Sequence, residues 1–263
     1  MRPLWPPLAV LGTVVAAALL LPLILPHGPV AIDWSAVAAP PGTAGHPAGT
    51  DDIGRDLLAR IAAGTLVTLG VAAAAAVTAL VIGTAWGATA GWCGGRVDEA
   101  MMRIVDALYA LPFMFVVILL TVVFGRSIVL VFVGIGAVEW LTMARVVRGQ
   151  VLSLKTRPFA LAAEAAGAPA RSILWRHMIP NTAGAAFAYL VLILPQVVMI
   201  ESFLSYLGLG VQEPRTSLGI LVKEGADGMD IAPHALILPG GVLVAILVAL
   251  TVLGDRLRRR FAA

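Results

Sequence analysis

Long apolar runs separated by short polar segments dominate the pattern of this 263-residue chain. A helix needs about 20 predominantly apolar residues to cross a bilayer. Six stretches come close to that length, and they are residues 8–25, 67–87, 107–124, 128–144, 183–200 and 236–253. The alternation of apolar and polar residues that marks a membrane β-barrel is absent. The pattern therefore predicts an all-α integral membrane protein with six transmembrane helices.

Composition supports this fold class. Apolar residues make up 60% of the chain and charged residues 13%, whereas a soluble domain carries about 25% charged residues. The mean hydropathy is +0.95. The second apolar stretch is rich in alanine and glycine, which allows a neighbouring helix to pack closely against it. The only cysteine, Cys93, excludes an intrachain disulfide.

The distribution of basic residues predicts the topology. Six spans place both termini on one side, and that side then carries 13 of the 18 basic residues, against five on the other. The positive-inside rule makes the first side cytoplasmic. Alternatively, the first apolar run is a cleaved secretory signal, since Arg2 precedes it and small residues follow near Ala38. That reading leaves the orientation of the rest unchanged.

Three regions follow from this topology. Residues 1–63 form the first helix, a Pro/Gly-rich outer loop and an amphipathic lead-in, in which Asp51 or Asp52 caps a short helix. The lead-in is either an interfacial helix or a surface that meets an external partner. Residues 64–254 form a five-helix core, and residues 255–263 form a basic cytoplasmic tail.

Three acidic residues near or within spans are candidate pathway or gate residues, because charge at membrane depth is costly and often functional. Asp106 lies at the mouth of the third span, with Arg103 one turn earlier as its expected partner. Glu139 lies within the fourth span and either pairs with Arg145 or Arg148 or lines the pathway. Glu201 opens an acidic outer loop, which is either solvated or a cation-attracting vestibule. Pro112 should bend or unwind the third span.

The chain lacks the motifs of an enzyme or an energy source. It has no GxxxxGK[ST] phosphate loop, HExxH, CxxC or GxSxG motif. The spans carry no succession of acidic residues and histidines as in a proton-driven carrier, and no repeat relates the two halves. The histidines fall on different segments and sides, which argues against a metal cluster; they are His27, His46, His177 and His234.

Residues 157–181 combine small side chains with a ring of positive charge. Five alanines lie between positions 160 and 166, and the surrounding basic residues are Lys155, Arg157, Arg171 and Arg176. Such a bare helix surface lets another protein approach closely. The segment therefore predicts a cytoplasmic docking surface for a separate protein that supplies energy.

This segment resembles the cytoplasmic "EAA" loop of ABC-importer membrane subunits, in which Glu-Ala-Ala is followed by Gly and then by a Leu-Pro pair. Five further stretches extend the resemblance to the second membrane subunit of the dipeptide/oligopeptide/nickel branch. They are residues 49–61, 96–112, 144–159, 201–214 and 253–261. The resemblance implies a type I ABC importer permease fold in a bacterial inner membrane.

The resemblance also implies partners. These are a second, similar permease subunit, two cytoplasmic ABC ATPases that use ATP and Mg²⁺, and an extracytoplasmic solute-binding protein. The chain itself is expected to bind no cofactor, metal or nucleic acid and to catalyse no reaction. Peptides are the first expected cargo, and nickel or another metal complex is the alternative. A self-sufficient channel or secondary carrier is the alternative from another class.

The loop departs from the family pattern in its register. Counting back from Gly167, the family glutamate falls on Leu161, and Glu164 lies three residues too late. Either Glu164 takes over the contacts of the family acid, or Leu161 faces a more apolar ATPase groove. Gly167 is expected to form the turn between two short helices, and Pro180 to mark the start of the fifth span. The resemblance thus assigns coupling to Leu161, Ala162, Ala163, Glu164, Gly167, Arg171 and Pro180.

Overall fold

The regular elements of the chain are helices, as the apolar pattern predicts. The computed structural model describes residues 3–125 and 128–261. In chain order the elements are α1 (Trp5–Ile24), α2 (Leu57–Cys93), α3 (Gly95–Tyr109), α4 (Phe113–Phe124), α5 (Ile128–Lys155), α6 (Pro158–Ala165), α7 (Ala170–Ile173), a π-helical turn (Leu174–Met178), α8 (Ile179–Tyr206), α9 (Leu218–Asp227) and α10 (His234–Phe261).

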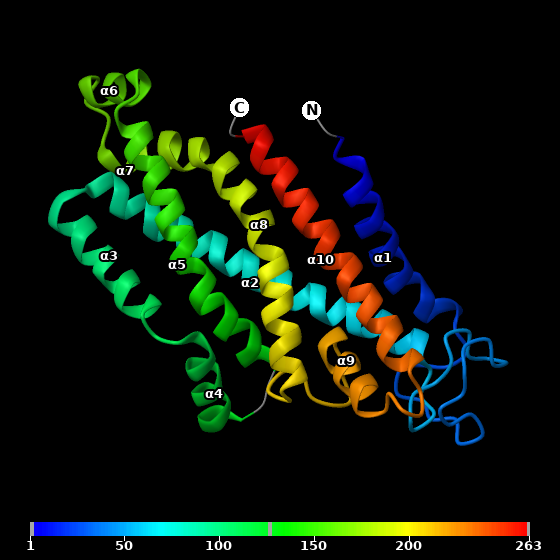
Figure 1. The fold of residues 1–263 in the computed structure, drawn as a ribbon. Helices are drawn as coiled ribbons and strands as arrows, with labels where there is room; N and C mark the ends of the chain where they lie inside the picture. The colour runs from blue at the N-terminus through cyan, green and yellow to red at the C-terminus, as the bar shows by residue number, and fades with distance from the viewer. Residues whose placement is uncertain (1–2, 126–127, 262–263) are drawn as a thin grey trace.

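Helix α2 is the centre of the bundle. It crosses behind α5, α8 and α10 (Figure 1) and packs against α1, α5 and α8. Its glycines at positions 83, 87 and 91 share one face and meet α5. A Cβ added at Gly83 would lie 2.6 Å from the Met143 Cβ, and one at Gly91 would lie 2.9 Å from the Arg148 carbonyl oxygen. The predicted close packing of the second span is therefore confirmed.

Four of the described helices are long and apolar enough to cross a membrane. They are Trp5–Ile24, Leu57–Cys93, Ala170–Tyr206 and His234–Arg260. The predicted fourth span lies within α5, and part of that helix falls on residues whose side chains lie outside the description. The predicted count of six continuous spans is therefore not reached among the described residues.

The predicted third span over residues 107–124 is interrupted at its proline. Helix α3 ends at Tyr109, and α4 begins at Phe113 after Pro112. Proline lacks a backbone N–H and disfavours helical geometry in the residue before it, so the helix breaks there. Because α4 has 12 residues, it is about 18 Å long, shorter than the roughly 30 Å hydrocarbon core. The expected effect of Pro112 is confirmed.

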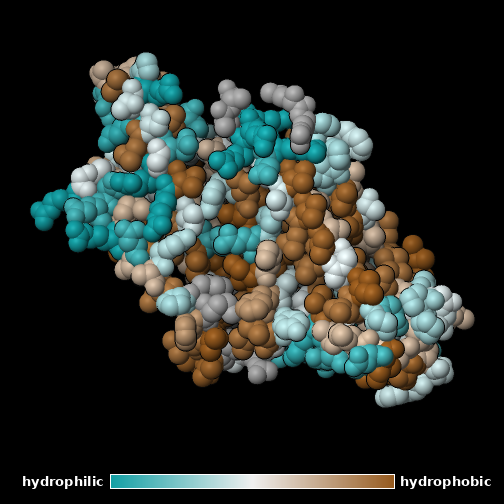
Figure 2. Space-filling model, in the orientation of Figure 1, coloured by the Kyte–Doolittle hydropathy of each residue, from teal (hydrophilic) through white to brown (hydrophobic). Residues whose placement is uncertain are grey.

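The molecule has two distinct ends. Both chain termini and α6 lie at one end, here called the terminal end, and the loop before α2 lies with α9 at the other, the loop end (Figure 1). Hydrophilic residues gather over α3 and α6 and again at the loop end, with an apolar belt between them (Figure 2). This is the surface pattern of a protein whose middle section lies in lipid.

The segment before α2 is a loop, as predicted, but its cap differs from the prediction. Neither Asp51 nor Asp52 caps a lead-in helix. Instead, Asp56 caps α2 directly, and its Oδ1 accepts a hydrogen bond of 2.7 Å from the Ala59 N–H. The amphipathic lead-in is therefore the first turn of α2, because no helix-breaking residue separates it from the apolar run.

Candidate functional site: the elbow at the terminal end

Residues 157–173, here called the elbow, form two short helices joined by a tight turn. Gly167 has a φ of +74°, a conformation that only glycine adopts at low cost. Its N–H donates to the Glu164 carbonyl over 2.9 Å, and the Ala168 N–H donates to the Ala163 carbonyl over 3.1 Å. These two bonds form a Schellman motif that ends α6. The predicted turn at Gly167 is confirmed.

The inner face of the elbow packs onto the helix bundle. Ala160 is 0% exposed and Ile173 is 1% exposed, and both lie in an apolar cluster with Trp92 of α2 and Val151 of α5. Ala163 packs against the same cluster. The chain itself therefore covers two of the five alanines that look bare in the sequence, Ala160 fully and Ala163 in part.

The outer face of the elbow is open. Leu161 is 53% exposed, and Ala162, Glu164 and Arg171 are also exposed. Trp175, in the turn that follows α7, is 57% exposed. Glu164 and Leu161 lie three residues apart on one side of α6, so both alternatives for the missing family acid remain open. Figure 2 shows this region projecting from the rest of the surface.

A cation fastens the base of the elbow. Lys155, the last residue of α5, donates from Nζ to the Trp92 carbonyl over 2.7 Å. The same Nζ lies 5.2 Å from the centroid of the Trp92 ring, within the range of a cation–π contact. The elbow thus connects to the ends of both α2 and α5.

Pro180 lies in the first turn of α8, as expected, but the chain is already helical before it. The helix runs continuously from Ala170 to Tyr206, through a π-helical turn at Leu174–Met178 in which the Ile179 N–H donates to the Leu174 carbonyl. A proline ring clashes with the carbonyl four residues earlier in a regular α-helix. The wider π turn directly before Pro180 accommodates that ring, so the elbow joins α8 without a break.

Asp106 has a different partner from the one expected. It accepts a hydrogen bond of 2.8 Å from Arg145 of α5, whereas Arg103 pairs with Glu99 over 2.6 Å. The Arg145 guanidinium also lies 4.4 Å from the centre of the Tyr109 ring. Asp106 therefore joins α3 to α5 at an exposed site.

Glu139 is buried within α5, with 4% of its surface exposed. The expected pairing with Arg145 or Arg148 is wrong, because Arg145 binds Asp106 and Arg148 binds Asp98 with two hydrogen bonds of 2.5 and 2.6 Å. Its role as a pathway residue stays a prediction.

Glu201 lies within α8 and is 0% exposed. Ser205 donates to its carboxylate over 2.8 Å, and Ser202 lies 3.4 Å from the other carboxylate oxygen. The reading of Glu201 as the first residue of a solvated outer loop is wrong, because α8 continues to Tyr206. The carboxylate is enclosed within the subunit.

Comparisons with known proteins agree with this arrangement. The family described as "Binding-protein-dependent transport system inner membrane component" matches residues 79–263. The chain is 46% identical over 227 residues to the oligopeptide transport system permease protein OppC of Haemophilus influenzae, covering 86% of this chain and 73% of that protein. The chain belongs to this family. It is a membrane component of a transport system rather than an ATPase, and it spans the membrane several times.

Two further relatives support the assignment. The permease subunit is 45% identical over 227 residues to OppC of Escherichia coli K12, covering 86% of this chain and 75% of that protein. It is 38% identical over 239 residues to the dipeptide transport system permease protein DppC of Bacillus subtilis, covering 90% and 74%. The stretches that carried the resemblance therefore belong to one continuous similarity.

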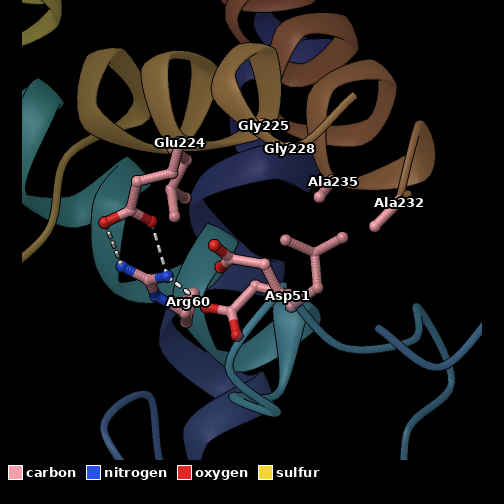
Figure 3. Close-up of a pocket in the computed structure, with 10 residues that line it drawn as sticks. Asp51, Arg60, Glu224, Gly225, Gly228, Ala232 and Ala235 are labelled. Carbon is pink, nitrogen blue, oxygen red and sulfur yellow. Dashed lines mark hydrogen bonds and ion pairs between the residues drawn. The ribbon is translucent and has the colours of Figure 1, made fainter. Parts of the chain in front are cut away.

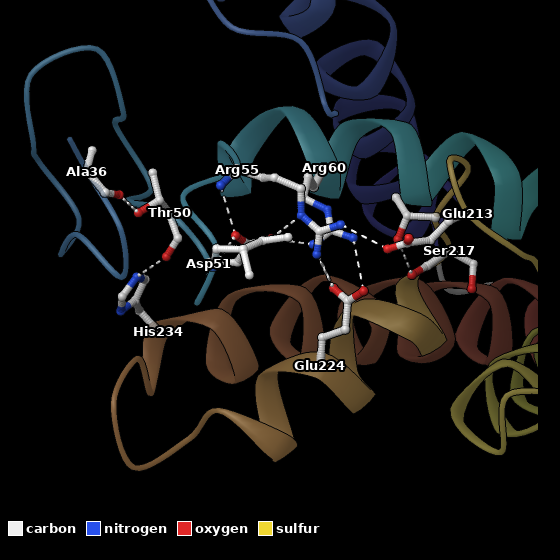
Figure 4. Close-up of polar contacts among 11 residues, drawn as sticks. Ala36, Thr50, Asp51, Arg55, Arg60, Glu213, Ser217, Glu224 and His234 are labelled. Carbon is white, nitrogen blue, oxygen red and sulfur yellow. Dashed lines mark hydrogen bonds and ion pairs between the residues drawn. The ribbon is translucent and has the colours of Figure 1, made fainter. Parts of the chain in front are cut away.

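The loop end of this permease subunit contains a network of charges that the sequence did not predict. Arg60, 3% exposed, donates to Glu224 of α9 over 2.6 and 3.2 Å and also bonds Asp51. Arg55 bonds Asp51 over 2.7 Å and lies 3.3 Å from Glu224. We call Asp51, Arg55, Arg60 and Glu224 the loop-end network (Figure 4). Figure 3 shows three of them, Asp51, Arg60 and Glu224, around a pocket at the same place.

Electrostatics keep Asp51 ionised in this network. Burial alone would raise its pKa, but hydrogen bonds from the Arg55 backbone and side chain and the charges of Arg60 and Arg55 hold the pKa below its ordinary value. The acidic residues after α8 are therefore not all solvated, since Glu224 is part of the network. The sequence contained one sign of this network, because Arg55 and Arg60 lie close to acidic residues of the same loop. It could not identify Glu224 as their partner, since Glu224 is 164 residues away from Arg60.

Proposed function

We propose that this chain forms one half of the translocation pathway of an ATP-driven importer for di- and oligopeptides. Its relatives include permease proteins named for oligopeptide and dipeptide transport systems, which supports peptides as the cargo. The pathway is completed by a second, similar permease subunit. The chain lies in a bacterial inner membrane with both termini in the cytoplasm, so that the terminal end meets the ATPases.

The observation that carries the proposal is the two-faced elbow. Its outer face exposes Leu161, Arg171 and Trp175, and its inner face is buried against α2 and α5. A protein that presses on the outer face therefore moves the ends of two long helices. The close packing of Ala160 and Ile173 against Trp92 transmits such a movement, because a densely packed protein interior has low compressibility.

The partner at the elbow is a cytoplasmic ATPase that binds ATP and Mg²⁺, and the permease subunit itself binds no nucleotide and hydrolyses nothing. Arg171 on α7 and Arg176 in the π turn, both exposed, supply positive charge toward an acidic groove rim. The apolar side chain of Leu161 fits the floor of such a groove. Two ATPases serve the pair of permease subunits, one for each elbow.

The opposite end receives cargo from a solute-binding protein. The loop-end network there holds the loop, α2 and α9 in one arrangement, because Arg60 and Arg55 each bridge Asp51 and Glu224. Charge-assisted hydrogen bonds of this kind hold the guanidinium and carboxylate groups in one geometry. A rigid platform at this end suits the repeated docking of a separate binding protein.

The test is reconstitution with the proposed partners, namely a second permease subunit, the ATPases and the solute-binding protein. Proteoliposomes that contain the complete complex should take up peptide only with ATP, and Arg171→Glu should reduce uptake at least tenfold while the complex still assembles. Arg259→Glu, a charge reversal in the exposed basic tail, is the matched control and should leave uptake unchanged. Uptake by the chain alone without ATP would instead identify a channel or carrier, and uptake of nickel but not peptide would identify the alternative cargo.

A further inference from the structure

Two histidines that the sequence analysis placed on unrelated segments lie against each other at the loop end. The rings of His27 and His46 are stacked with their centroids 4.5 Å apart. Asp33 joins them, and one ligand atom from each of the three residues lies within 4.8 Å of the other two. The argument from sequence against a metal cluster is therefore wrong for this pair, because the loop folds back on itself between residues 27 and 46.

Each of two members of the cluster is held by a partner on its far side. His46 is 1% exposed, and its Nδ1 lies 2.8 Å from Asp56 Oδ2 while its Nε2 lies 3.4 Å from Asp33 Oδ2. Asp33 Oδ1 accepts hydrogen bonds from the Ser35 N–H over 2.9 Å and from the Ser35 hydroxyl over 2.5 Å. Histidines that bind metals are oriented in this way by a carboxylate on the second ring nitrogen.

The third member has an atom without a partner. His27 Nδ1 is buried, and no hydrogen-bond partner for it exists among the described residues. A buried polar atom without a partner costs free energy that a ligand recovers.

From this geometry we propose that His27, Asp33 and His46 bind a divalent transition metal of the zinc type at the loop end. Two imidazoles and one carboxylate form a nitrogen-rich donor set that suits Zn²⁺. Two ligand atoms at the corners of a tetrahedron around Zn²⁺ lie about 3.3 Å apart. The most widely separated ligand atoms of the cluster therefore move roughly 1.5 Å closer together when zinc binds. A fourth position is open to water.

The metal fastens the loop to the second helix. Asp56, which orients His46, is also the residue that caps α2 through the Ala59 N–H. The Asp33 N–H bonds the Gly54 carbonyl over 2.9 Å, three residues before α2. Bound Zn²⁺ therefore links residues 27–46 to the start of α2 as a clip in the loop.

The test measures zinc in the assembled transporter, purified through an affinity tag without histidines. Equilibrium dialysis followed by elemental analysis should find one Zn²⁺ per copy of this chain, and Zn²⁺ should raise the unfolding temperature of the complex. His27→Ala and Asp33→Asn should each weaken Zn²⁺ binding by at least about tenfold and abolish the thermal shift. His234→Ala removes a loop-end histidine outside the cluster, which instead bonds the Thr50 carbonyl, and should keep full occupancy.

Three outcomes would overturn the proposal. The first is a complex that binds no stoichiometric zinc at neutral pH. The second is unchanged zinc affinity in both His27→Ala and Asp33→Asn. The third is a metal-independent gain in stability below pH 6 that requires His46, which would identify the cluster as an imidazolium held between Asp33 and Asp56. Because cargo uptake is not the readout, these results do not depend on the proposed transport function.

Discussion

At the terminal end, Leu161, Arg171 and Trp175 stand in solvent on an elbow that buries only its inner face, whereas at the loop end Arg60 is enclosed between Asp51 and Glu224. The outer side chains of the elbow are therefore accessible to another protein. At the loop end, the charges of the network are already paired within the chain. The elbow therefore exposes side chains that a partner protein can contact, whereas the loop-end network is already complete within the chain.

The contrast also explains why the substitutions that damage each end differ. Removing one partner of an enclosed ion pair lowers the stability of the protein strongly, because the other ion stays buried without a counter-charge. An exposed side chain is replaced with little effect on stability, so its loss appears only in function. The predictions below separate these two cases.

The largest loss of stability should follow Arg60→Met. It removes the more buried of the two guanidinium groups that Asp51 and Glu224 share and should lower the free energy of unfolding by about 3 kcal/mol. Denaturation of the purified subunit in detergent measures this. Arg215→Met, at an exposed arginine of the same end, should change it by less than about 0.5 kcal/mol. Equal effects of the two substitutions would show that the network is not structural.

Tryptophan substitutions at two neighbouring alanines should distinguish the two faces of the elbow. Ala163→Trp forces a large side chain toward the cluster around Trp92 and should cost about 2 kcal/mol of stability. Ala162→Trp points outward and should leave the unfolding curve unchanged while preventing ATPase binding. An unfolding loss in Ala162→Trp would contradict the assignment of the faces.

Gly167→Ala should have a smaller effect, of about 1 kcal/mol, because alanine resists the positive φ of the Schellman turn. A Cβ at this position meets no atom within 4 Å, so the cost is purely conformational. Gly70→Ala, in the middle of α2 and equally free of contacts, should instead stabilise the helix slightly. Thermal unfolding of both variants tests the opposite signs.

The smallest effect at neutral pH concerns the titration of Asp51. Its pKa is lowered in the folded state from an ordinary value of 3.8. The stability it contributes is therefore complete above the ordinary value and disappears as the pH falls through the lowered one. Unfolding temperatures measured from pH 6 to pH 3 should show this acid-side loss, and Asp51→Asn should flatten it. An unaltered profile in the variant would assign the loss to other groups.

Features set by local sequence were predictable. The break at Pro112 depends on one residue and its neighbour, and the turn at Gly167 depends on a glycine after a run of helix formers. The fold class followed from the length of the apolar runs. Each of these arises within about one helical turn of the residue that causes it.

Features set by contacts between distant segments were not predictable. Arg145 pairs with Asp106 across 39 positions, and Arg60 pairs with Glu224 across 164. The single sequence offers many acids for each arginine, and only the packing of α2 against α9 selects one. The inward turn of Ala163 was missed for a related reason, since a surface of alanines looks the same on every side until the bundle covers one of them.

The central claim, that the elbow is the docking surface for a cytoplasmic ATPase, is tested most directly by site-specific photo-cross-linking in the assembled transporter. Cys93→Ser removes the only cysteine, and Ala162→Cys or Glu213→Cys then carries a benzophenone at the terminal or the loop end. The probe at position 162 should cross-link to an ATPase subunit, and the probe at position 213 should not. Cross-linking at position 213 with none at position 162 would contradict the claim.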